Sequence, residues 1–302
     1  MTDTSYGTHH SRTTERDATT AELDSTAGLL TMISTQLGNQ LSNRRPLRER
    51  PRPPALVLVA HGSRNPGALA TVTELVADIS ELRPELTVRL GHIELNAPLL
   101  GDTLAALPAG RAVLVPLLLS RGHHVKRDIP AAAAAAGHLS TVVAAPLGPH
   151  PLLVDALHDR LTAAGWPEGP LPEHERRRTG VVLAAAGSRD PQAAVDTRRT
   201  ADLLARRLGV PVVPGYASAA APDVATAVRA LSARGRTRIA VASYFTAPGR
   251  FADESAAALA TGRGIAAAPL GTHPAMARLV LHRYDSALAA PGTAFTPHLA
   301  TA

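Results

Sequence analysis

Residues 56–66 read LVLVAHGSRNP. The segment opens with a short apolar run, which is typical of a strand buried on both faces, and it ends at a His61-Gly62-Ser63 turn. Apolar residues then recur at helical spacing from Gly67 to Leu82. A buried strand, a polar turn and an amphipathic helix in this order indicate an α/β protein with parallel strands.

The alternation of strands and helices continues through the first half of the chain. Three further strands are expected near residues 86–93, 111–119 and 139–145. Helices are expected from Pro98, from near Asp128 and over about 150–164. Four parallel strands with helices on both faces follow, and functional residues then belong at the carboxyl ends of the strands.

The second half of the chain repeats the first. LVLVAHGSRNP returns as VVLAAAGSRDP at 181–191, GHIELNAP at 91–98 as GYASAAAP at 215–222, and APLGPHP at 145–151 as APLGTHP at 268–274. The offset stays close to 124 residues. This duplication predicts two tandem lobes of one α/β fold. We expect lobes at 54–163 and 179–290, a proline-rich linker at 164–178, a disordered N-terminal tail at 1–53 and a C-terminal tail at 291–302.

Composition excludes several classes of function. The 302 residues include no Cys, which removes disulfides, thiolate metal sites and cysteine nucleophiles. Much of the formal charge of +6 lies in a basic run at 44–52, whose prolines and lack of aromatic residues indicate a solvated linker and no nucleic-acid site. No segment has the length of a membrane span or the order of a signal peptide, so we expect a cytoplasmic protein without a membrane partner.

The two halves differ in the residues that can bind a metal. His61 follows the first strand, and its counterpart is Ala186; Glu94 follows the second, and its counterpart is Ser218. The segment SRGHHVKRDIP at 120–130 has two histidines after the third strand, whereas its counterpart SYFTAPGRFADES has none. Imidazole and carboxylate groups bind divalent metals and move protons, so one sheet edge is predicted to hold an open metal site in the first half.

The histidines differ in how strongly position supports a role. His61 and His124 are the predicted ligands, and His123 stays an alternative because adjacent loop side chains rarely face one pocket together. His150 and His273 occupy equivalent turns in both halves, which favours a structural role there.

The motifs AHGSR at 60–64, GHIELNAP at 91–98, VPLLLSRGHHVKRDIP at 115–130 and APLGPHP at 145–151 resemble the sirohydrochlorin chelatase family of the CbiX and SirB type. A weaker resemblance covers about 179–290. It implies a chelatase fold and the insertion of Fe²⁺ or Co²⁺, as substrate, into a sirohydrochlorin-type tetrapyrrole without ATP.

The resemblance also implies roles for residues. His61 and His124 fall on the metal-holding positions, and Glu94 on a catalytic and substrate-contacting position. The predicted substrate-binding residues are Glu94, Ser120, Arg121, Gly122, His123, His124 and Arg64. Arg64, Arg121, Lys126 and Arg127 flank the histidines and suit a polycarboxylate, as do Arg189 and Arg250 in the second half. We expect a monomer, because two lobes can mimic a dimer.

Two other functions fit parts of the sequence. A metal or tetrapyrrole carrier would need the same site without turnover. A serine hydrolase or phosphate-binding module could use Ser63 or Ser188, but neither lies in G-x-S-x-G. Lys126 is the sole lysine and does not lie in a nucleotide-binding P-loop motif. The sequence leaves the choice between Fe²⁺ and Co²⁺ open.

Overall fold

The structure of the chain is a computed structural model that describes residues 30–34, 36, 52–259 and 264–290. Residues 1–52 and 53–302 form separate units. Residues 30–34 and 36 are helical and exposed. The N-terminal tail predicted to be disordered lies almost entirely outside the described residues, and the C-terminal tail at 291–302 lies wholly outside them. No helix within the described ranges has both the length and the apolar character needed to cross a lipid bilayer.

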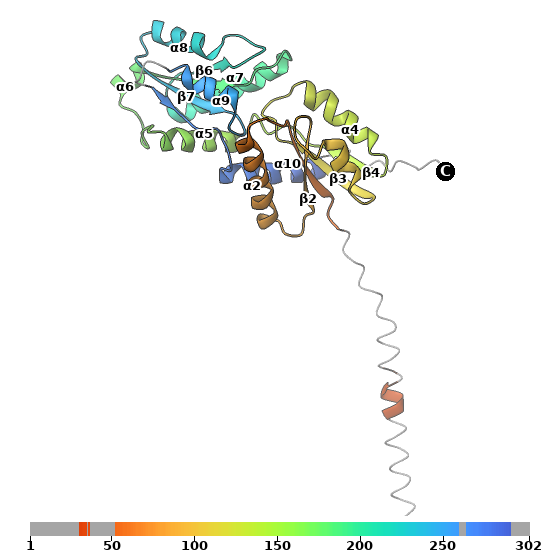
Figure 1. Cartoon of the computed structure of the whole chain (residues 1–302). Helices are drawn as coiled ribbons and strands as arrows, with labels where there is room; N and C mark the ends of the chain where they lie inside the picture. Colours follow the sequence, from red (N-terminus) through yellow and green to blue (C-terminus); the bar gives the residue numbers. More distant parts are fainter. Residues whose placement is uncertain (1–29, 35, 37–51, 260–263, 291–302) are drawn as a thin grey trace, which may run out of the picture. The chain divides into compact units, whose positions relative to one another are not determined.

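The first half forms a four-stranded parallel sheet (Figure 1). Its strands are β1 (Ala55–Ala60), β2 (Val88–His92), β3 (Gly110–Pro116) and β4 (Leu139–Val143). They lie in the order β2-β1-β3-β4. The central strand β1 is buried because it pairs with a neighbour on each side, Leu56 with both Val88 and Val113.

The second half builds a sheet of the same order, β6-β5-β7-β8, and all of its pairings are parallel. Its strands are β5 (Thr179–Ala185), β6 (Val212–Tyr216), β7 (Arg238–Tyr244) and β8 (Ile265–Ala266). The prediction of two α/β lobes with four-stranded parallel sheets is therefore confirmed.

Helices cover both faces of each sheet. They are α2 (Pro66–Leu82), α3 (Leu100–Ala105), α4 (Ile129–Ala135), α5 (Pro151–Ala163), α6 (Glu173–Arg178), α7 (Pro191–Leu208), α8 (Val224–Ala233), α9 (Arg250–Ala257) and α10 (Pro274–Ala289), with the π-helix η1 (His124–Asp128) before α4. Alternate residues of β1 serve the two faces: Leu56 packs in the cluster that contains α2, and Val57 in the cluster that contains α3 and α4. Burial on both faces explains the unbroken apolar run of this strand.

The histidines shared by the two halves begin helices. The Nδ1 atom of His150 accepts a hydrogen bond from Leu152 N at 3.2 Å, and that of His273 accepts one from Ala275 N at the same distance. Each ring caps a helix that has Pro at its first position. The predicted structural role of this pair is confirmed.

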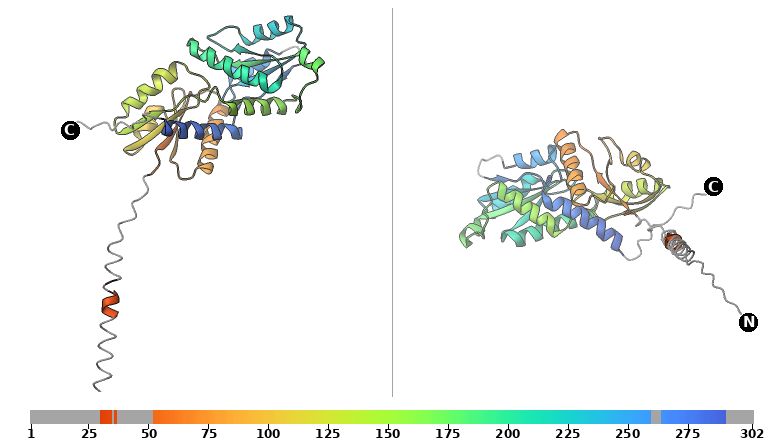
Figure 2. Two further views of the ribbon diagram at one scale, coloured as in Figure 1. Left: turned by 180° about the vertical axis from the view of Figure 1, so that it is seen from behind. Right: turned by 90° about the horizontal axis from the view of Figure 1, so that it is seen from below.

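The last helices of the two halves are exchanged. Helix α5 packs against α7 and β7 of the second lobe, while α10 packs against α2 and β3 of the first (Figure 2). Two arginines mark the exchange: Arg160 of α5 donates to Leu270 O at 2.9 Å, and Arg283 of α10 donates to Leu147 O at 2.9 Å. The two halves consequently share one apolar cluster between their sheets.

The segment expected to be a linker carries structure of its own. Residues 166–171 bring Trp166 and Leu171 into the shared apolar cluster, and α6 follows directly before β5. Arg238 on β7 donates to Glu175 of α6 at 2.7 Å. The connection between the halves is thus packed against the second lobe.

Candidate active site

The carboxyl ends of both sheets open into one cleft of about 1220 Å³. Its walls come from the turns after β1, β2 and β3 in the first half and after β5, β6 and β7 in the second. The strand ends of the two lobes therefore face a common cleft. A cleft with walls from both halves can enclose a ligand that neither sheet edge would cover alone.

His61 and His124 meet in this cleft although 62 positions separate them in the chain. His61 directly follows β1, and His124 begins η1 after β3, the strand that pairs with β1. Their ring centroids are 4.8 Å apart and the rings are nearly perpendicular. The side chains are 44% and 33% exposed, so both imidazoles are open to a ligand.

The π-helix η1 determines the surroundings of His124. Its wide turn closes with a bond from Ile129 N to His124 O, a geometry that occurs frequently at functional sites. Within this turn the Nδ1 atom of His124 lies 2.5 Å from Asp128 Oδ2. Because a carboxylate accepts, this contact favours the tautomer with the proton on Nδ1, in which Nε2 is the nitrogen that could bind a metal.

Asp128 also lies near the neighbouring histidine. Its Oδ1 is 3.7 Å from His123 Nε2, but the His123 side chain is 74% exposed. Asp128 is not among the residues predicted from the sequence to form the site. Its spacing of four residues from His124, directly before the helix expected from near Asp128, is the signal that could have found it.

Glu94 lies beside His61, with 3.6 Å between Glu94 Oε1 and His61 Nδ1. The turns after β1 and β2 are held together by a backbone bond from Glu94 N to His61 O at 3.0 Å. Leu95, the next residue, has a φ of +68°, which is unfavourable for a side chain of this size. Its exposed side chain lines the cleft, so backbone strain coincides with the site.

Gly62 makes the close approach of these turns possible. Its φ is +101°, and a Cβ atom at this position would lie 1.8 Å from Glu94 O. Gly187 in the second half has a φ of +89°, and a Cβ there would lie 1.9 Å from Ser218 O. Both halves thus use glycine for the same backbone contact.

The three side chains offer two imidazole nitrogens with a carboxylate alongside. Among the described residues, no group of three or more His, Asp or Glu side chains has the arrangement of a preformed metal site. Two nitrogens with a nearby carboxylate are suited to a metal that arrives and leaves again, since open positions remain for other ligands.

The serine hydroxyls of the two G-S turns accept hydrogen bonds from backbone N–H groups. Ser63 Oγ accepts a hydrogen bond from Asn65 N at 3.1 Å, and Ser188 Oγ accepts one from Asp190 N at 3.1 Å. Each bond stabilises the turn before α2 or α7. Among the described residues, neither hydroxyl is hydrogen-bonded to an imidazole, so the geometry gives no support to a serine nucleophile.

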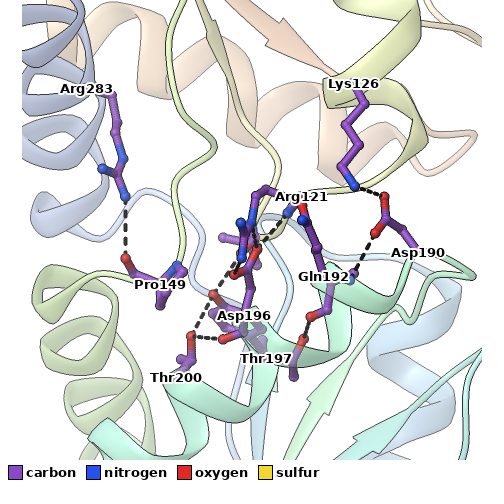
Figure 3. A network of polar contacts seen from close by, with 12 residues as sticks. Arg121, Lys126, Pro149, Asp190, Gln192, Asp196, Thr197, Thr200 and Arg283 are labelled. Atoms are coloured by element: carbon purple, nitrogen blue, oxygen red, sulfur yellow. Dashed lines mark hydrogen bonds and ion pairs between the residues drawn. The ribbon is translucent and has the colours of Figure 1, made fainter. Parts of the chain in front are cut away.

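The basic residues predicted to bind substrate separate into two groups. Arg64 and Arg250 line the cleft. Arg121, Lys126, Arg127 and Arg189 lie outside the lining, as far as the described residues define it. Of these, Arg121 and Lys126 connect the two halves, Lys126 through an ion pair with Asp190 (Figure 3).

Arg121 is bound to Asp196 of α7, whose side chain is only 1% exposed. The carboxylate accepts bonds from the Arg121 backbone N at 3.0 Å, from Nε at 2.9 Å and from Nη2 at 2.6 Å (Figure 3). Burial disfavours the charged carboxylate, but these bonds outweigh it and lower the pKa of Asp196 below its usual range. We therefore assign Arg121 to the connection between the halves rather than to the substrate loop.

A buried tyrosine extends this connection. Tyr244 at the end of β7 donates to Leu119 O at 3.0 Å and lies 3.2 Å from Thr200 Oγ1. Burial raises the pKa of the Tyr244 phenol. The polar contacts between the halves therefore lie directly behind the cleft, where they hold the two walls at a set separation.

Replacing Asp196 with Asn should lower the free energy of unfolding by about 2 kcal/mol, because hydrogen bonds to charged groups contribute about that much. The folded-state pKa is lowered, so the wild-type contribution is complete above the unfolded pKa of about 3.9 and is lost as the pH falls through the folded value. Urea unfolding at a series of acidic pH values measures this. The Asn variant should lose less stability on acidification than the wild type, and acid limbs of equal slope would contradict the assignment.

Comparisons with known proteins agree with this architecture. The sirohydrochlorin ferrochelatase, chloroplastic, of Arabidopsis thaliana is 34% identical over 113 residues, which cover 35% of this chain and 50% of the relative. The sirohydrochlorin cobaltochelatase of Methanococcus aeolicus is 38% identical over 79 residues, which cover 25% and 55%. The chain therefore spans about half the length of these curated relatives.

Solved structures share the fold of the whole two-lobed body. SirB from Bacillus subtilis with Fe³⁺ superposes with a TM-score of 0.65 at 22% identity, covering 77% of this chain and 94% of that one. CbiX, the terminal enzyme for biosynthesis of siroheme in denitrifying bacteria, superposes with a TM-score of 0.57 at 22% identity, covering 77% of this chain and 99% of that one. The sequence profile of one family matches twice, at residues 55–164 and 180–287, which together exceed half of the chain. The chain belongs to the CbiX family.

Proposed function

We propose that this protein inserts a divalent metal, Fe²⁺ or Co²⁺, into a sirohydrochlorin-type tetrapyrrole. The observation that carries the proposal is the His61–His124 pair, with ring centroids 4.8 Å apart in a cleft of about 1220 Å³. The names of the relatives, which include a ferrochelatase and a cobaltochelatase of sirohydrochlorin, support the same reaction.

Metal insertion requires two events at one place. The ring gives up two pyrrole N–H protons, and the metal moves from protein ligands to four ring nitrogens, so that one M²⁺ is consumed and two H⁺ are released. His61 and His124 hold the metal through imidazole nitrogens and accept the departing protons. Glu94, 3.6 Å from His61, takes a proton onward or contacts the ring nitrogens.

Asp128 positions His124 in this mechanism. The bond at 2.5 Å fixes the ring so that its second nitrogen is free, and it stabilises the imidazolium formed when a proton arrives. His61 lacks a comparably short side-chain partner among the contacts described, since Glu94 lies 3.6 Å away. His61 is therefore the more mobile of the two ligands and the better suited to release the metal.

The substrate's carboxylates need cationic partners at the rim of the cleft. Arg64 and Arg250 come from opposite halves and both line it. Guanidinium groups bind carboxylates through paired hydrogen bonds. Binding at both walls also agrees with activity as a monomer, since one chain supplies the whole cleft.

ATP has no part in the proposed reaction. The sole lysine, Lys126, forms an ion pair with Asp190 and does not belong to a phosphate-binding loop. Insertion is driven instead by the chelate stability of the metallated ring.

The test is absorbance spectroscopy of sirohydrochlorin with the full chain and Co²⁺ or Fe²⁺, with and without ATP. A catalyst gives many equivalents of metallated product per chain at a rate above the protein-free control, and ATP leaves that rate unchanged. A carrier of metal or tetrapyrrole gives at most one equivalent. That second result would replace the enzyme proposal with the binding function.

A further inference from the structure

The aromatic side chains of the cleft come from one half only. Residues 54–163 contain no Phe, Tyr or Trp, whereas the second half contributes four aromatic residues to the cleft lining. These are Tyr216, Tyr244, Phe245 and Phe251. The wall opposite His61 and His124 therefore has a different chemistry from the wall that carries them.

Backbone contacts identify Phe251 as the counterpart of His124. In the first half Lys126 N donates to Gly122 O at 3.1 Å, and in the second Asp253 N donates to Gly249 O at 3.1 Å. These two glycines also face the opposite lobes: a Cβ on Gly122 would lie 3.5 Å from Ser188 Oγ, and one on Gly249 would lie 3.9 Å from Ser63 Oγ. The offset between the two halves is two residues larger here than at the G-S turns, because SYFTAPGRFADES has extra residues before its glycine.

With this alignment, every candidate metal-site residue of the first half has a counterpart that is neither a histidine nor a carboxylate. Phe251 occupies the position equivalent to His124, and Ser255 the position equivalent to Asp128. Ala186 and Ser218 are likewise equivalent to His61 and Glu94. Ser255 Oγ donates to Phe251 O at 2.6 Å, so it is committed to its own helix. The second wall has an apolar ring where the first has an imidazole ligand.

Phe251 is the aromatic residue best placed to meet a planar ligand. Tyr216 and Tyr244 are buried, and Tyr244 uses its hydroxyl within the connection between the halves. Phe245 packs against the apolar cluster of the second sheet. Phe251 is half-buried at the start of α9 and lines the cleft.

Arg250 accompanies this ring as a cation. Its guanidinium carbon lies 4.8 Å from the centre of the Phe251 ring, and its side chain is 76% exposed. The cation–π contact restricts the guanidinium to the neighbourhood of the ring. One aromatic face and one cation side by side match a planar macrocycle with carboxylates around its rim.

We propose that Phe251 and Arg250 form a platform that binds the tetrapyrrole across the cleft from His61 and His124. This inference rests on the proposed function. Phe251 stacks on one face of the macrocycle, and Arg250 pairs with a carboxylate at the rim of the macrocycle. The macrocycle then lies between this platform and the wall that carries His61 and His124. The degenerate half thereby acts as the substrate-orienting wall of the enzyme.

The test compares Phe251→Leu, which keeps an apolar side chain but removes the π face, with Phe251→Tyr, which keeps the ring. Phe245→Leu is the matched control, since it removes the other phenylalanine of the same wall. The measurements are the Kd of metal-free protein for sirohydrochlorin, kcat and KM for insertion, and the Kd for Co²⁺ alone.

Phe251→Leu should raise Kd for sirohydrochlorin and KM about tenfold, the effect expected from losing one stacked aromatic face. Its kcat and its Co²⁺ affinity should stay within about twofold of wild type, and Phe251→Tyr and Phe245→Leu should resemble wild type in KM. Unchanged KM in Phe251→Leu, in a chain whose wild type turns over, overturns the platform and leaves the enzyme proposal standing. A wild type that neither binds nor metallates sirohydrochlorin overturns the proposed function itself.

Discussion

Replacing His61 or His124 with Ala is expected to abolish metal insertion, with kcat falling by at least about 10³-fold. Each change removes a metal ligand and a proton acceptor together, and general acid–base catalysis alone contributes about 10²–10⁴. The fold should survive, because both side chains lie at exposed strand ends rather than in the apolar clusters. Stopped-flow absorbance gives the rate, and circular dichroism checks the fold.

Two further variants should lower the rate of insertion by smaller amounts. Glu94→Gln should slow insertion by about 10-fold to 100-fold, since water or buffer can partly replace a proton acceptor. His123→Ala should lose less than either ligand variant, because the His123 ring is more exposed than the His124 ring and lies farther from Asp128. Substantial turnover in His61→Ala or His124→Ala would contradict the proposed metal site, and a loss in His123→Ala as large as in His124→Ala would make His123 a ligand.

Replacing Gly62 with Ala should damage both stability and activity. The new Cβ would lie 1.8 Å from Glu94 O at a φ of +101°, so the turns after β1 and β2 must separate. Strain of this kind costs about 3 kcal/mol, which lowers Tm by roughly 10 °C in a domain of this size. Because His61 and Glu94 belong to the displaced turns, kcat should fall by about 10²-fold or more in protein that is still folded.

Gly187→Ala is the matched control for this backbone effect. Its Cβ would lie 1.9 Å from Ser218 O at a φ of +89°, so the loss of Tm should be similar. The turn that it displaces carries Ala186 and Ser218 instead of metal-competent side chains, so kcat should change far less than in Gly62→Ala. Equal losses of kcat in the two variants, measured well below both Tm values, would show that the chemistry does not depend on the first half alone.

Much of the candidate site could be predicted from the sequence because position after a parallel strand has a simple meaning. β1 and β3 pair directly, so side chains that follow them, His61 and His124, must lie close together at one sheet edge. The duplication added an internal comparison, in which Ala186 shows that the strand and turn do not need the histidine. These inferences use local pattern and chain order alone.

Contacts between residues far apart in the chain decided the roles that the sequence left open. In the sequence, Arg121 and Arg64 are both cations close to a predicted histidine ligand. Only the structure shows that Arg121 is bound to the buried Asp196, whereas Arg64 lines the cleft. Phe251 became the counterpart of His124 through matching backbone bonds, since the extra residues in its loop hide the alignment. A side chain's partner depends on three-dimensional neighbours, which spacing does not specify.

The same distinction holds for the fold. The apolar runs of the first half and their repeat in the second predicted two equivalent four-stranded sheets. This was possible because a strand buried on both faces requires a nearly continuous run of apolar residues. The lobe bounds predicted from the repeat, 54–163 and 179–290, assign each last helix to its own half, yet α5 packs on the second lobe and α10 on the first. Equivalent helices have equivalent apolar faces, so either sheet could accept either helix. Tertiary contacts made the choice, through Arg160 on Leu270 O, Arg283 on Leu147 O and the apolar cluster that both helices share between the sheets.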